Sequence, residues 1–344
     1  MCIRDSDKWV SFFPAYRLPG IFRSCGLPLF RDRCRLNDTD PPMIFRHGQP
    51  LSPSAQADSS PRAVSYTHLR AHATVLDLVC RLLLEKKNIQ QPIYSSYYIN
   101  HHGFKILVDP VLSGHASPFS SMVKAFKGAD IYKAEDIPEI DLLLITHDHY
   151  DHLDYKVVLK LKHKFKKVLT ALGVGSHLEY WGIDSNKIVE LDWWESYRAN
   201  ENIEFTSTPS RHFSGRTLKR ANTLWSSFVL DLGNKKIFLG GDSGYDSQFK
   251  QIGEKYGPFE LAILDCAQYG ANWPYIHMVP EQTTQAALDL QAKVLLPVHW
   301  GKFALANHPW TEPIERINKS AEFLKVFVNA VSYTHLTLPT SDLV

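Results

Sequence analysis

Hydrophobic residues recur in short, regularly spaced runs from about residue 94 to residue 330. Short runs rich in β-branched and aromatic side chains predict strands. The predicted strands lie at residues 95–100, 104–109, 141–146, 167–170, 203–208, 224–232, 236–240, 261–265 and 293–298. His-His-Gly separates the first two runs, which predicts a β-hairpin.

Helical periodicity appears between several of these strands. The predicted helices span residues 155–165, 280–291 and 311–327, and the last two carry a proline near their start. Strands that alternate with helices, but also follow one another directly, indicate a mixed sheet rather than a purely parallel one. The simplest organisation is one domain of about 240 residues.

Composition supports a boundary near residue 93. Arg outnumbers Lys ten to three in residues 1–93, whereas Lys outnumbers Arg twenty to five in residues 94–344. The first segment also holds four of the five cysteines, and Cys266 is predicted to be a buried strand residue. No disulfide framework is therefore predicted, which fits a reducing compartment.

The heptapeptide AVSYTHL occurs twice, at residues 63–69 and 330–336, without a repeat architecture around either copy. Both copies, and MCIRDS at the start of the chain, resemble translated sequencing-adapter sequence. We therefore predict non-native flanks at residues 1–90 and 331–344, the first of them disordered or poorly structured. The native domain is predicted over residues 91–330.

The sequence contains few features typical of membrane-bound or nucleic-acid-binding proteins. No run of 18 apolar residues predicts a membrane span, and MCIRDSDKWV lacks the apolar core of a signal peptide. These features predict a cytoplasmic protein whose natural N-terminus is missing, with peripheral membrane association as an alternative. The lysine-rich run KLKHKFKK at residues 160–167 is either a solvated helix end or a contact with anionic lipid headgroups. With a net charge of +2, no nucleic-acid partner is expected.

The stretch THDHYDHLDY directly follows the apolar run DLLLI, so it belongs to a loop that leaves a buried strand. Neutral imidazoles two residues apart on an extended loop point the same way, so His147 and His149 can bind one cation. A turn at Tyr150 then presents Asp151 and His152 to a second cation. The loop supplies only about half the ligands that two cations need.

Further ligands are predicted at later strand ends. His212, Asp242 and His299 each follow an apolar run, and Gly240 and Gly241 allow the backbone to approach a crowded centre closely. Each residue alone is as well explained by a capping or loop role. Their recurrence in the same position favours a shared metal centre in which Asp242 bridges two cations.

This ordered series of ligands resembles the metallo-β-lactamase superfamily. Longer stretches resemble its branch that contains N-acyl-phosphatidylethanolamine-hydrolysing phospholipase D and bacterial relatives, namely THDHYDHLDY, PSRHFSGR, GGDSGYD and PVHWGKFALANHPWTEP. The resemblance covers residues 94–330. It implies an α/β (α+β) fold, a four-layer αββα sandwich with two Zn²⁺ ions at one edge of the sheets, Mn²⁺ or Fe²⁺ being alternatives. The implied ligands, with Asp242 as the bridge, are His147, His149 and His212 for one ion and Asp151, His152 and His299 for the other.

The resemblance implies a phosphodiesterase of phospholipase D type that acts on a small-molecule or lipid substrate. A hydroxide that bridges the cations is expected near neutral pH, because coordination lowers the pKa of water from about 16 to about 7. Asp151 is expected to orient this hydroxide, and Asp242 to bridge the cations. His277 resembles a family position near the reacting centre, and Tyr150 is a candidate hydrogen-bond donor to substrate. Their competing interpretations are a loop histidine and a packing tyrosine.

Fold and metals do not set the substrate class, so a lactonase or other carbonyl hydrolase is the alternative. Nucleic-acid processing is supported only by the lysine-rich run. One departure from the family concerns the first strand, where an aromatic-Gly-His-Ser stretch is usual and this chain reads NIQQPIYSSYYIN. A truncated first strand is therefore predicted. The sequence gives no prediction of oligomeric state.

Overall fold

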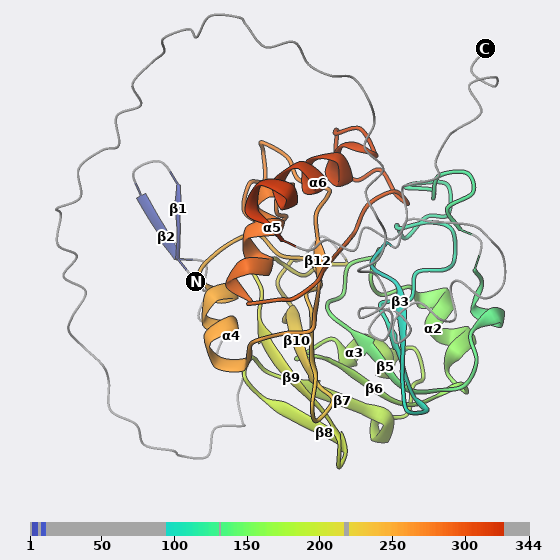
Figure 1. Ribbon diagram of the computed structural model, residues 1–344. Coiled ribbons are helices and arrows are strands. Elements are labelled where there is room, and N and C mark those ends of the chain that lie inside the picture. Colours follow the sequence, from blue (N-terminus) through green and yellow to red (C-terminus); the bar gives the residue numbers. More distant parts are fainter. Residues whose placement is uncertain (1, 6–7, 12–93, 131, 217–219, 327–344) are drawn as a thin grey trace, which may run out of the picture. The chain divides into compact units, whose positions relative to one another are not determined.

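The computed structural model describes residues 2–5, 8–11, 94–130, 132–216 and 220–326. The chain divides into two compact units, Met1–Val64 and Ser65–Val344. In the first unit, β1 (Cys2–Asp5) and β2 (Lys8–Ser11) form an antiparallel pair (Figure 1). Apart from this pair, the predicted flanks and the boundaries at 91 and 330 lie outside the described residues.

The second unit contains two sheets (Figure 1). In order of hydrogen bonding, one consists of β3 (Tyr97–His101), β4 (Phe104–Val108), β5 (Ile140–Ile145), β6 (Phe165–Ala171) and β7 (Ile188–Leu191). The other consists of β13 (Leu295–Val298), β12 (Leu261–Asp265), β11 (Lys236–Leu239), β10 (Ser226–Asp231), β9 (Ile203–Pro209) and β8 (Ser196–Asn200). All nine predicted strands correspond to one of these elements.

Both sheets are mixed, as the sequence predicts. The β3–β4 hairpin is antiparallel, and β4 to β7 are parallel neighbours. In the other sheet β11, β12 and β13 are parallel, whereas β8 to β11 alternate in direction. The parallel strands end at a common edge in each sheet, and this edge is where the polar loops begin.

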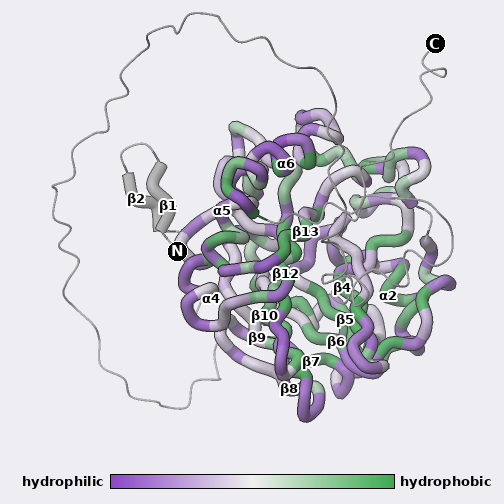
Figure 2. Tube along the Cα trace, viewed as in Figure 1, coloured by the Kyte–Doolittle hydropathy of each residue, from purple (hydrophilic) through white to green (hydrophobic). Residues whose placement is uncertain are grey.

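Helices cover the outer face of each sheet and complete four layers. On the first sheet lie α2 (Tyr155–Leu161) and α3 (Gly175–Tyr180), with the short 3₁₀ turns η1 (Ala134–Asp136) and η2 (Ser185–Lys187) in neighbouring loops. On the second sheet lie α4 (Gln248–Tyr256), α5 (Pro280–Asp289) and α6 (Glu312–Leu324). Figure 2 shows hydrophobic segments concentrated in the central strands and a mixture of hydrophilic and hydrophobic positions along the helices. The predicted αββα sandwich is confirmed.

Strand β5 explains why the sequence reads DLLLI without alternation. Leu142 and Leu144 face the core between the sheets, whereas Leu143 and Ile145 face the core under α2 and α3. Both faces are buried, so the strand is apolar throughout. Each fully buried leucine or isoleucine contributes roughly 1.5–3 kcal/mol relative to an exposed one. This packing fixes the strand from which the metal-binding loop departs.

The predicted helix at residues 155–165 is too long. Helix α2 ends at Leu161, and β6 begins at Phe165, which is buried and pairs with Ile140. Burial of Phe165 on the sheet outweighs the helical pattern of the lysine-rich run. Helices α5 and α6 are also two to three residues shorter than predicted at their C-terminal ends.

Lysines of the run 160–167 are engaged within the protein. Lys160 pairs with Glu135 at 2.9 Å and Lys166 with Asp141 at 2.6 Å. These exposed pairs agree with the interpretation of a solvated surface segment, and contact with lipid headgroups stays a prediction. Among the described residues, no helix is long and apolar enough to cross a bilayer.

The sequence did not predict β7, β8, α3 or α4. Strand β8 is an edge strand whose residues are exposed or half-buried, so it lacks the apolar signal of the central strands. Helix α3 is only six residues long, too short for a periodic pattern to stand out.

Candidate metal centre

Polar side chains gather where strands of both sheets end. Six of these strands are followed or terminated at this edge by a histidine or aspartate that is buried. These residues are Asp109 after β4, His147 after β5, His212 after β9, Asp242 after β11, Asp265 at the end of β12 and His299 after β13. The seven predicted metal ligands thus converge on one place, the first four of them from the loop after β5.

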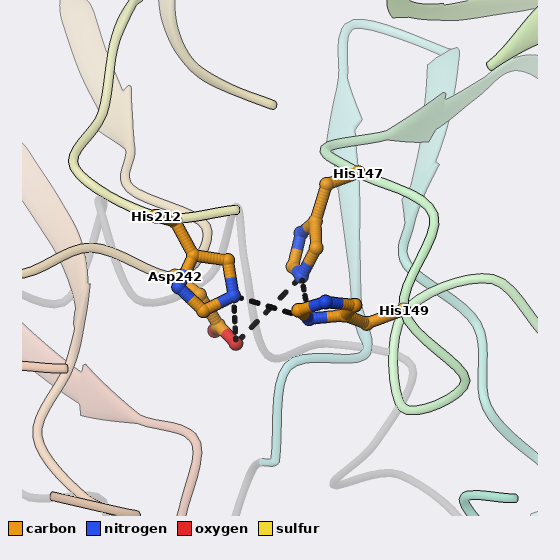
Figure 3. A group of neighbouring side chains, drawn as sticks. All are labelled: His147, His149, His212 and Asp242. Carbon is orange, nitrogen blue, oxygen red and sulfur yellow. Dashed lines mark hydrogen bonds and ion pairs between the residues drawn. The ribbon is translucent and has the colours of Figure 1, made fainter. Parts of the chain in front are cut away.

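The first group of potential donors consists of His147, His149, His212 and Asp242 (Figure 3). The Nδ1 atom of His149 lies 3.1 Å from the Nε2 atoms of both His147 and His212. The Oδ2 atom of Asp242 lies 3.8 Å from the same two Nε2 atoms. Four donors arranged tetrahedrally around Zn²⁺ would be about 3.3 Å apart, so the separations suit one ion.

Hydrogen bonds elsewhere leave two of these imidazole nitrogens without a proton. His212 has Nδ1 at 2.8 Å from the carbonyl of Ile276, so Nδ1 carries the proton and Nε2 is bare. Thr146 donates its hydroxyl proton to Asp109, so it accepts from His147 Nδ1, and Nε2 of His147 is bare as well. A single N–H on Nδ1 of His149 cannot donate to the Nε2 lone pairs of both His147 and His212. The chemistry of this group therefore fits a cation at its centre.

The second group consists of Asp151, His152, His299 and again Asp242. Asp242 Oδ2 lies 3.1 Å from His152 Nε2 and 3.3 Å from His299 Nε2. Asp151 Oδ2 lies 3.0 Å from His299 Nε2. His299 adopts a φ of 70°, a left-handed conformation that is costly for histidine and typical of functional positions. Asp242 Oδ2 belongs to both groups.

Electrostatics distinguish the two groups. Burial lowers the pKa values of His147, His149 and His212, so these rings are neutral and offer lone pairs. Burial alone would lower the pKa of His152, yet the carboxylates around it raise that pKa well above its ordinary value. Against the opposing effect of burial, His152 holds the pKa of Asp242 well below its ordinary value. Negative charge converges on the second group, where a divalent cation would balance it.

The other aspartates of THDHYDHLDY fix the loop. Asp148 accepts a hydrogen bond from the backbone of Gly215 at 2.7 Å. Asp154 caps α2 by accepting from the backbone N–H groups of Lys156 and Val157. Of the three aspartates, only Asp151 points its carboxylate at the donor groups.

Gly241 brings Asp242 close to the loop after β5. Its φ is 59°, and a Cβ there would lie 3.1 Å from Cβ of Thr146. A side chain at this position would be strained and would push the two loops apart. Gly241 thus serves the close approach that the sequence suggests, whereas Gly240 lies against the backbone of β12 at Ile263.

Asp109 is a buried residue of the site that the sequence analysis missed. Its Oδ2 accepts from His152 Nδ1 at 2.8 Å and from the Thr146 hydroxyl at 2.7 Å. This contact holds a proton on Nδ1 of His152, so that Nε2 is the nitrogen that would face a cation. The signal was present, since Asp109 follows the apolar run FKILV as His147 follows DLLLI.

Replacing Asp109 with asparagine should weaken metal binding by about 10- to 100-fold. The amide can donate to His152, which would move the imidazole proton to Nε2 and block that donor. The measurement is a chelator-competition titration with Zn²⁺. Asp141→Asn, at the start of β5, is the control and should bind as the wild type does. Equal affinities for all three proteins would contradict the role of Asp109.

His277 lies beside the donor groups and forms a further potential donor group with Asp242, Asp265 and His299, whereas Tyr150 points elsewhere. A catalytic role for His277 stays a prediction. The His277 ring stacks on His299 with centroids 5.1 Å apart, and its Nδ1 lies 3.3 Å from Asp265 Oδ2. Tyr150 donates its hydroxyl to the carbonyl of Arg216 at 2.7 Å, and its ring lies under the Arg216 guanidinium. A catalytic role for Tyr150 stays a prediction, because its hydroxyl is already engaged with the Arg216 carbonyl.

Residues 105–300 match the beta-lactamase superfamily domain. The chain belongs to the metallo-β-lactamase superfamily. This confirms the family and fold that the sequence motifs predict. Both groups of potential metal donors lie within the matched region of this metallo-β-lactamase chain.

This metallo-β-lactamase chain is similar in sequence to proteins from a bacterium and from a yeast. An uncharacterised protein of Mycobacterium tuberculosis is 41% identical over 233 residues, which are 67% of this chain and 62% of the relative. The mitochondrial N-acyl-phosphatidylethanolamine-hydrolysing phospholipase D of Saccharomyces cerevisiae is 31% identical over 281 residues, 74% of this chain and 59% of that protein. The chain thus spans about three fifths of the length of these relatives.

A solved structure shares the fold at low identity. The isothiocyanate hydrolase from Delia radicum gut bacteria superposes with a TM-score of 0.54 at 18% identity, over 70% of this chain and 96% of that one. At this identity the likeness establishes the metallo-β-lactamase fold and leaves substrate open.

Proposed function

We propose that this chain is a dinuclear, Zn²⁺-dependent hydrolase of phospholipase D type, acting on N-acyl phosphatidylethanolamine-like or related phosphodiesters. The observation that carries the proposal is Asp242 Oδ2, which lies in both potential metal groups, 3.1 Å from His152 Nε2 and 3.8 Å from His147 Nε2. A shared carboxylate is suited to hold two cations side by side. The similarity to the yeast phospholipase D supports the choice of a phosphodiester.

The donor types suit Zn²⁺. Mn²⁺ and Fe²⁺ are alternatives, because imidazole and carboxylate ligands bind all three ions. When bound, two such cations lower the pKa of coordinated water and withdraw charge from substrate oxygens. Neutral His147, His149 and His212 would hold one ion. The carboxylates of Asp151 and Asp242 bring compensating negative charge, and Asp151 orients the attacking water by accepting a hydrogen bond.

His277 is proposed to hold a proton beside the reacting atoms. It lies between two donor histidines, with ring centroids 5.1 Å from both His212 and His299. Asp265 fixes the ring through Nδ1, and Thr283 in turn donates to the Asp265 carbonyl at 2.9 Å. The opposite ring nitrogen, Nε2, is then free to take a proton from the attacking water and to pass that proton to the departing alkoxide.

A substrate panel tests this function on the full chain loaded with Zn²⁺. We expect hydrolysis of bis-p-nitrophenyl phosphate, and release of phosphatidic acid from mixed micelles containing N-acyl phosphatidylethanolamine. Five- and six-membered lactones are the comparison, because the same centre can attack a carbonyl carbon. Diester turnover should exceed lactone turnover by at least about tenfold, a difference of roughly 1.4 kcal/mol in transition-state stabilisation.

Asp242→Asn serves as the control, since it keeps the side-chain volume and loses the bridging charge. It should remove all phosphodiester activity that belongs to this centre. Lactone hydrolysis without diester hydrolysis would replace the proposed function with that of a carbonyl hydrolase. Activity that survives in the Asp242→Asn variant would place the reaction outside this site.

A further inference from the structure

Tyr94 lies against the second donor group, a contact that no sequence pattern predicts. Its side chain is 2% exposed, and its hydroxyl oxygen lies 2.9 Å from Asp151 Oδ2 and 3.0 Å from His299 Nε2. Those two donor atoms are themselves 3.0 Å apart. The three atoms therefore form a nearly equilateral triangle.

These separations match those among atoms that bind one cation. In the first group, the imidazole nitrogens of His147, His149 and His212 are also separated by 3.1 Å along two edges. Donors about 2.0–2.1 Å from an ion are about 2.9 Å apart when the angle between them is a right angle. The triangle at Tyr94 thus fits one face of a five- or six-coordinate site.

Packing holds the phenol in this place. Tyr94 makes an edge contact with Phe303 at a centroid distance of 5.0 Å and lies 4.7 Å from the ring of His299. With Val111 and Ala116, Tyr94 and Phe303 form a small hydrophobic cluster beside the site. Rotating the hydroxyl away would leave a buried oxygen without a partner, which costs about 1–3 kcal/mol.

We propose that the Tyr94 hydroxyl oxygen is a fifth protein donor to the second cation. The assignment rests on the proposed dinuclear centre. The second group would then supply two nitrogens and three oxygens, whereas the first supplies three nitrogens and one oxygen. Oxygen-rich sites favour harder cations such as Mn²⁺ and Fe³⁺ relative to nitrogen-rich sites. The two sites therefore differ in metal preference as well as in affinity.

Metal titrations of the full chain test this assignment with Tyr94→Phe. Tyr98→Phe is the matched control. Tyr98 lies four residues further along, on β3, its side chain is only 5% exposed, and its hydroxyl has no hydrogen-bond partner among the described residues. In chelator-competition titrations with Zn²⁺ and Mn²⁺, Tyr94→Phe should lose at least about tenfold in affinity for the second ion. The first ion should bind unchanged, which also verifies that the variant is folded.

A spectrum separates a donor from a residue that only orients Asp151. A cation favours loss of the proton from an oxygen bound to it, so Fe³⁺ loading should give a visible phenolate-to-iron charge-transfer band. The band should be present in the wild type and Tyr98→Phe and absent from Tyr94→Phe. Absence of the band from the wild type, or an unchanged second affinity in Tyr94→Phe, would overturn the assignment alone. Binding of fewer than two ions by the wild type would instead refute the dinuclear centre, and the assignment with it.

Discussion

Replacing Asp242 with alanine is expected to lower phosphodiester hydrolysis by more than about a hundredfold, the upper end of the loss seen for residues that merely support a ligand. The variant should also bind less than half of the wild-type metal. Asp242 Oδ2 lies in both donor groups, so its removal takes one donor from each ion. It also removes the largest source of the raised pKa of His152. Zinc content per chain and initial rates provide the measurements.

Asp231→Ala is the control for this substitution. Asp231 ends β10, whose other end lies beside the site through the bond of Ser226 N–H to the Thr146 carbonyl. The control removes a carboxylate from the same sheet and leaves both donor groups intact. Its metal content and rates should equal those of the wild type. If Asp242→Ala retained two ions and full activity, the assignment of Asp242 as the bridging carboxylate would be wrong.

Removing the metal with a chelator is expected to lower the melting temperature by roughly 5–10 °C. A ligand present at 100 times its dissociation constant stabilises the folded state by about 2.7 kcal/mol. For a domain of this size, each kcal/mol corresponds to about 2–4 °C. The physical reason lies in the buried donor residues, since Oδ1 of Asp242 and Nδ1 of His299 have no hydrogen-bond partner among the described residues. Without a cation, that desolvation is uncompensated.

Calorimetry in the presence and absence of EDTA gives this shift directly, and added Zn²⁺ should restore the original melting temperature. The same scans on Asp242→Ala should respond to the chelator much less. Identical melting temperatures for the metal-loaded and metal-free wild type would show that the centre adds nothing to stability. In that case the buried donor atoms of the metal-free protein would have to form contacts with protein or water that stabilise the fold as much as the metal contacts do.

Much of the fold follows from the sequence because the central strands are buried on both faces. DLLLI and LAILD are short, apolar runs of the length typical of core strands. The end of the first locates the loop that carries His147, and the second ends in Asp265 itself. Strand β8 escaped prediction because it is a polar edge strand, and α2 was predicted too long because lysines continue its pattern. Tertiary packing of Phe165, which local sequence does not encode, ends that helix.

The site divides in the same way. The donors follow from one rule, that polar residues directly after apolar runs collect at one edge, and the same rule would have found Asp109. Tyr94 escapes it, because this residue precedes a strand and reaches the site from the hydrophobic cluster around Phe303. Tautomers and shared oxygens also require coordinates, since they depend on contacts between residues far apart in the chain.

The donors come from both sheets, with His147 and His149 carried by β5 in one and His212 and Asp242 by β9 and β11 in the other. A cation bound among them would clamp the two halves of the sandwich together at their rim. The thickness of the hydrophobic layer between the sheets therefore sets the distance between the donor atoms that the two sheets carry. Substitutions to larger or smaller side chains in this layer, for example at Phe228 or Leu230, would change the metal affinity although every ligand residue is retained.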